Sequence, residues 1–87
     1  MNELKPPPLA SSPEATEVLR VWAAPGSPQQ FTLQPTWDDP ATWGLLLSDL
    51  ARHVAKAYAA QGLSETESFE RIIAGLRAEL GNPSHLP

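Results

Sequence analysis

The stretch from Asp39 to Gly62 constrains the fold most, because its pattern is typical of one long amphipathic helix. Asp39 is well placed as the N-cap with Pro40 at the first helical position, and Gly62 suits the position after the last turn. The apolar residues that recur at spacings of three and four are Trp43, Leu46, Leu47, Leu50, Val54, Ala57 and Tyr58. Because they share one face of the helix, another part of the protein must cover that face.

A second helix is predicted at about residues 65–80. Ser64 and Glu67 match a capping box, in which the serine hydroxyl accepts a hydrogen bond from the Glu67 amide. The apolar stripe of this helix consists of Phe69, Ile72, Ile73, Leu76 and Leu80. Because only one or two residues separate it from the first helix, at about residues 40–60, we expect an antiparallel helix pair.

Two strands are predicted before the helices, at about residues 18–23 and 30–35. Phe31 and Leu33 alternate with polar residues, which is typical of a half-buried strand. Residues 24–29 are rich in turn formers and make a loop that is too long for a two-residue turn. We therefore expect an antiparallel β-hairpin. Ser12, as an N-cap before Pro13, predicts a short N-terminal helical turn.

The predicted fold class is α+β, with the hairpin packed on the helix pair. We expect residues 1–12 to be a disordered Pro-rich tail, residues 13–81 a single α+β domain, and residues 82–87 a C-terminal tail. Neither a secretory signal nor an apolar run of membrane-spanning length is visible, so the sequence predicts a soluble, cytoplasmic protein.

Composition narrows the function classes. The formal net charge of the 87 residues is −4 and the six Lys and Arg residues are scattered, so we expect no nucleic-acid partner. The absence of Cys excludes disulfides and thiol catalysis. The His and Asp residues do not show metal-ligand spacing, so we expect neither a metal nor a cofactor. Both signs of charge mix on the polar helix face, which argues against a membrane-surface partner.

The lengths of the predicted elements favour a homodimer. The first helix should run about 31 Å at 1.5 Å per residue, whereas strands of this size span only about 17–20 Å. A two-stranded hairpin cannot cover both helices and is marginal by itself in water. With no disulfide to compensate, we expect two copies to associate, either through their hairpins or through their long helices.

One cluster of polar residues is a candidate functional site. Asp49 and His53 lie one helical turn apart with Arg52 beside them, and an Asp–His pair can orient an imidazole for base catalysis. The same spacing is also an ordinary contact on a helix surface. Among the aromatic residues, Trp22 is the one we expect to face a partner, because it lies on the opposite strand face from Leu19 and Val21.

The blocks Glu17-Val-Leu-Arg-Val-Trp22 and Trp43-Gly-Leu-Leu-Leu-Ser-Asp-Leu-Ala-Arg-His53 resemble a family of small bacterial proteins known only as a domain of unknown function. The resemblance covers about residues 14–80. It implies a bacterial origin, a small stand-alone protein and no assigned activity. It carries over no catalytic residue, but it draws attention to Arg20, Asp49, Arg52 and His53, which lie inside the resembling blocks.

Two functions remain open from the sequence. The first is a non-enzymatic, dimeric interaction or accessory module, whose sheet edge or aromatic surface engages an unidentified protein partner. The second is a small-ligand-binding or enzymatic module that uses Arg20, Asp49, Arg52 and His53 at a dimer interface. Nothing in the sequence indicates a specific reaction, so we lean away from an enzyme.

Overall fold

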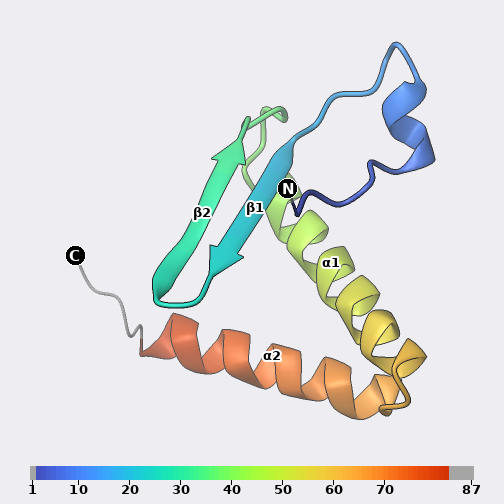
Figure 1. The fold of residues 1–87 in the computed structure, drawn as a ribbon. Helices are drawn as coiled ribbons and strands as arrows, with labels where there is room; N and C mark the ends of the chain where they lie inside the picture. Colours follow the sequence, from blue (N-terminus) through green and yellow to red (C-terminus); the bar gives the residue numbers. More distant parts are fainter. Residues whose placement is uncertain (1, 83–87) are drawn as a thin grey trace. The chain divides into compact units, whose positions relative to one another are not determined.

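The structure is a computed structural model that describes residues 2–82 (Figure 1). The chain divides into two compact units, which we call the strand unit (Met1–Asp38) and the helical unit (Asp39–Pro87), and each is described by itself. The single domain expected over residues 13–81 stays a prediction. Of the C-terminal tail expected at residues 82–87, residues 83–87 lie outside the described part of the chain.

The strand unit contains an antiparallel β-hairpin of β1 (Leu19–Ala24) and β2 (Ser27–Leu33), as the sequence predicts. The register pairs Val21 with Phe31 and Leu19 with Leu33, so these four apolar side chains share one face of the hairpin. Arg20, Trp22, Gln30 and Thr32 share the other face. The hairpin therefore has one apolar and one mixed face.

The prediction of a long loop between the strands is wrong. Ala24 pairs with Ser27, so Pro25 and Gly26 alone make the turn. Gly26 has φ +78, the value that the third position of a type II turn requires. The pairing shifts between Trp22 and Ala24, which leaves an extra residue on β2 where Pro28 lies. This bulge lets the proline, which has no amide hydrogen to donate, remain within the strand.

The N-terminal helical turn exists, but it precedes Ser12 instead of following it. A 3-10 helix, η1, spans Pro8–Ser11, inside the segment that we expected to be a disordered tail. At Ser12 the hydroxyl accepts a bond from the Glu14 amide at 3.3 Å, and the carbonyl accepts one from the Ala15 amide at 3.1 Å. These bonds close a local turn, which competes with helix formation at this residue type.

In the helical unit, α1 (Ala41–Ala60) and α2 (Glu65–Gly81) begin and end where the sequence predicts. A carboxylate oxygen of Asp39 accepts from the Ala41 amide at 3.0 Å. At the other end, Gly62 has φ +95 and the Leu63 amide bonds the Tyr58 carbonyl at 3.2 Å, which is the Schellman arrangement. Ser64 then caps α2 through a 3.2 Å bond from the Glu67 amide.

The packing of α1 differs from the expectation. Among the described residues only Ala51 and Ala55 are buried, at 7% and 1% exposure. Ala55 lines the same shallow hollow as Thr66 and Phe69 of α2, so it lies where the two helices meet. By contrast Leu50 in the predicted apolar stripe is 44% exposed. Small side chains allow the closest approach of two helices, and this decides which side of α1 is covered.

The two helices meet near their connecting turn and diverge from there, so they form an open V rather than lying along each other's full length (Figure 1). At the far end of α2, Leu76 is 45% exposed and Leu80 is 73% exposed. The last turns of α2 therefore bury little apolar surface in a single copy.

The segment between β2 and α1 contains one strained residue. Thr36 has φ +66, and the Trp37 amide bonds the Pro35 carbonyl at 2.6 Å. This is the pattern of a γ-turn with a positive central φ, which is uncommon for a β-branched residue. The Thr36 hydroxyl donates to the Gln34 carbonyl at 3.0 Å, which helps hold this backbone conformation.

Replacing Ser64 by Ala should lower the free energy of unfolding by about 1 kcal/mol, because the Glu67 amide loses its acceptor. Chemical denaturation monitored by circular dichroism measures this. Ser48→Ala on the exposed part of α1 is the control and should be neutral or slightly stabilising. Equal effects of the two substitutions would contradict the cap.

Replacing Ala55 by Leu should lower the free energy of unfolding by about 1–3 kcal/mol, because the larger side chain cannot fit between the helices. Ala57→Leu is the matched control on the exposed side of α1 and should change it by less than about 0.5 kcal/mol. A larger effect at Ala57 than at Ala55 would show that the helix packs on the other side.

Candidate functional site

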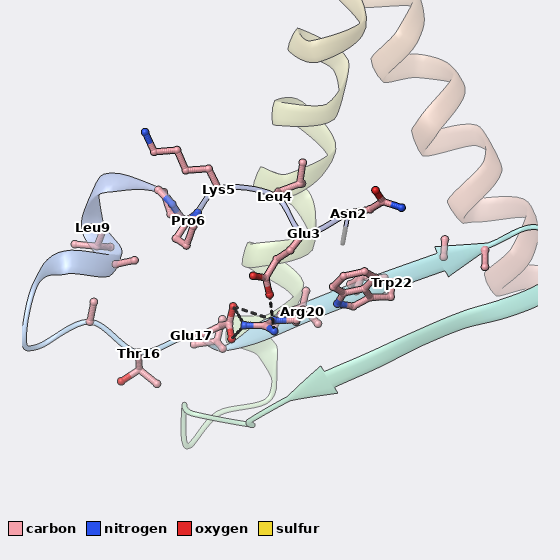
Figure 2. A pocket seen from close by; sticks show the side chains of 18 residues that line it. Asn2, Glu3, Leu4, Lys5, Pro6, Leu9, Thr16, Glu17, Arg20 and Trp22 are labelled. Carbon is pink, nitrogen blue, oxygen red and sulfur yellow. Dashed lines mark hydrogen bonds and ion pairs between the residues drawn. The ribbon is translucent and has the colours of Figure 1, made fainter.

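Arg20 is the most highly connected polar residue of the strand unit. Its Nη2 donates to both Glu17 carboxylate oxygens at 2.9 and 3.2 Å, and its Nε donates to Glu17 Oε2 at 3.4 Å. Its Nη1 donates to Glu3 Oε2 at 3.0 Å (Figure 2). The hydrogen bond to Glu17, and then the negative charges of Glu17 and Glu3, raise the pKa of Arg20. The guanidinium therefore links the N-terminal segment to β1.

A wide hollow of about 1000 Å³ lies between the N-terminal segment and β1 (Figure 2). Its walls are residues 2–7, 9 and 10 on one side and the run of residues 15–24 on the other. Leu4, Leu9 and Trp22 give it apolar character, and Arg20 with its two carboxylates forms its polar part. Trp22 itself is 41% exposed, and its predicted role of facing a partner stays a prediction.

Asp49 and His53 lie within reach of each other on α1. The His53 Nδ1 is 2.8 Å from the Asp49 backbone carbonyl and 3.6 Å from the Asp49 carboxylate. The side chains are 68% and 72% exposed, so water surrounds both. A proton on Nδ1 donated to the backbone carbonyl leaves Nε2 facing away from Asp49. This geometry is a contact on the helix surface. The imidazole lacks the burial that is typical of a catalytic base.

Arg52 makes a different contact from its two neighbours in the cluster. Its guanidinium carbon lies 4.9 Å from the centroid of the Phe69 ring on α2, a cation–π arrangement. The two residues also line the shallow hollow between the helices. Arg52 therefore contacts α2 from α1, next to the buried Ala55.

The four residues of the predicted cluster therefore make different contacts. Arg20 belongs to the strand unit, and Asp49, Arg52 and His53 belong to the helical unit. The structure brings Asp49 and His53 together and directs Arg52 to Phe69. Their use as one site stays a prediction.

Sequence reasoning missed the two acidic partners of Arg20. Glu17 stands three residues before Arg20, a spacing that could have been noticed. Glu3 is 17 residues away, and no periodic pattern connects it to β1.

The part of the chain that the structure describes contains no group of three His, Asp or Glu side chains that could hold a metal ion. Within the same residues, neither helix has the length and apolarity required to cross a bilayer.

Residues 3–84 match the family described as a domain of unknown function (DUF5076). The chain belongs to this family. A solved structure from the photosynthetic bacterium Rhodopseudomonas palustrus CGA009, described as "a putative pyruvate dehydrogenase", is 36% identical and has a TM-score of 0.73. The match covers 100% of this chain and 94% of that one. A comparison with curated proteins finds no match.

A double-mutant cycle should detect the contact between Arg52 and Phe69. Combining Arg52→Ala with Phe69→Leu, which keeps an apolar side chain but removes the ring face, should give a coupling energy of about 0.5–1 kcal/mol. The control cycle pairs Lys56→Ala with Phe69→Leu, because Lys56 lines the same hollow, and it should give a smaller coupling. Equal couplings would show that no specific cation–π contact exists.

Proposed function

We propose that this protein is a non-enzymatic interaction module that acts as a homodimer and presents a surface to a protein partner. The supporting observation is the amount of large apolar side chain that one copy leaves exposed. It occurs on every strand and helix: Val21 is 48% exposed, Phe31 63%, Leu47 50% and Leu80 73%. Association with a partner would remove such side chains from water.

The small amount of apolar surface that one copy buries supports the same proposal. Each square ångström of apolar surface removed from water contributes about 25 cal/mol, and two buried alanines supply very little of this. A two-stranded sheet needs further strands or a packed helix to be stable in water. Association of two copies supplies the missing burial without a disulfide or a metal.

The alternative is a ligand-binding or enzymatic module built from Arg20, Asp49, Arg52 and His53. It draws less support, because Arg20 already bonds two carboxylates and Arg52 already contacts Phe69. The remaining pair, Asp49 and His53, is exposed on one helix.

The description of the Rhodopseudomonas relative does not supply a reaction for this chain. The turn at Pro25 and Gly26 leads into a strand, whereas phosphate groups bind where a glycine-rich turn opens a helix. This turn therefore lacks the setting of a phosphate-binding loop.

Sedimentation equilibrium at micromolar concentration should give a mass of twice the 9.4 kDa of one chain. The dimer should persist in 1 M salt, because burial of apolar surface is not screened by ions as surface charge pairs are. A mass of one chain at both salt concentrations would contradict the proposal. Dissociation only in high salt would assign the association to charged groups instead.

A further inference from the structure

The two outer edges of the hairpin differ. The outer edge of β2 carries Pro28 and the bulge, which are devices that block the addition of another strand. The edge of β1 that faces away from β2 contains neither, from Leu19 to Ala24. Among the described residues the sheet has only these two strands, so β1 is flanked by a strand on one side only.

The hydrogen bonds of the hairpin show which β1 groups point to this edge. The Gln34 amide donates to the Val18 carbonyl at 3.0 Å, so Val18 and Gln34 form a hydrogen-bonded pair. Such pairs alternate along an antiparallel ladder. Arg20 and Trp22 therefore bond across to β2, whereas the backbone N–H and C=O of Leu19 and Val21 point outward.

The hollow described above runs along the same edge. In both figures the N-terminal segment lies on the side of β1 away from β2 (Figures 1 and 2). Consecutive residues 15–24 line the hollow, and these include members of both hairpin faces. A cavity on one face would be lined by alternate residues, so this groove follows the strand edge.

We propose that the groove along the β1 edge receives β1 of a second copy, antiparallel, to make one four-stranded sheet. This inference rests on the proposed homodimer and names the surface that forms it. The register that centres the two-fold axis on Val21 pairs Val21 with the partner's Val21 and Leu19 with the partner's Ala23. A shift by two residues toward the turn would set Leu19 opposite Pro25, which cannot donate a hydrogen bond.

Side-chain chemistry is self-complementary in this register. Arg20 lies opposite the partner's Trp22 in a non-hydrogen-bonded pair, where cross-strand side chains approach most closely. The hydrogen bonds of Arg20 to Glu17 use the edge of the guanidinium, and its flat face remains available for the indole. The two-fold axis repeats this contact, so each copy supplies one cation and one ring.

The pairing also completes the apolar face of the sheet. Leu19, Val21, Phe31 and Leu33 of one copy lie on the same face as the same four residues of the other. Doubling the number of strands converts a marginal hairpin into a sheet that can be stable on packing. The Glu3–Arg20 ion pair, with both side chains about half exposed, is weak enough to let the N-terminal segment move aside for the incoming strand.

Single-cysteine trapping tests the proposal in the 87-residue chain, which has no cysteine of its own. Val21→Cys places the two thiols on the two-fold axis, where paired Cα atoms lie about 5.5 Å apart, within the range of a disulfide. Phe31→Cys is the matched control on the outer edge of β2, and Leu50→Cys reports a dimer formed through α1. Mild oxidation followed by a non-reducing gel measures the rate of cross-linking.

We expect the Val21→Cys chain to cross-link at least about tenfold faster than either other variant, with unchanged circular dichroism. A sedimentation mass of two chains with faster trapping at Phe31→Cys or Leu50→Cys would overturn the β1 interface and leave the proposed dimer intact. A mass of one chain would overturn both proposals.

Discussion

The contact between α1 and α2 beside Ala55 is the one on which the helical unit depends. Because the Ala55 side chain is a single methyl group, the helices can approach closely there, and the Arg52 guanidinium lies over the Phe69 ring beside it. The larger apolar side chains of α1 lie outside this contact. A helix pair that meets through small side chains leaves many of its large apolar side chains exposed.

The sequence predicted the parts of the fold that local chemistry determines. Asp39, Gly62 and Ser64 end or begin helices through bonds within a few residues of themselves, so their roles follow from residue type and spacing. The two helices and the antiparallel hairpin were predicted for the same reason. The covered side of α1 was not, because periodicity identifies an apolar stripe but does not say where the smallest residues permit contact.

The turn of the hairpin shows a second limit. The turn formers of residues 24–29 suggested a loop that extends to Gln29. The strand instead begins at Ser27, because a bulge accommodates a residue without an amide hydrogen. Ladder irregularities depend on both strands at once, and a single-strand pattern does not reveal them.

The candidate site was predictable only where its members are neighbours in sequence. Asp49 and His53 are one turn apart and do lie together. The direction of the Arg52 side chain depends on Phe69 in another helix, and the bond from Arg20 to Glu3 joins residues 17 positions apart with η1 between them. Both contacts arise from tertiary packing, which brings together residues that share no local pattern.

Pro28 has a consequence for how far assembly can proceed. In a four-stranded sheet joined at β1, the two outermost strands are both β2, and each carries the proline and the bulge. The two-fold pairing would occupy both β1 edges, and the proline and bulge would hinder the addition of a strand at the β2 edges. Growth of the proposed sheet into an open fibre would then stop at two copies.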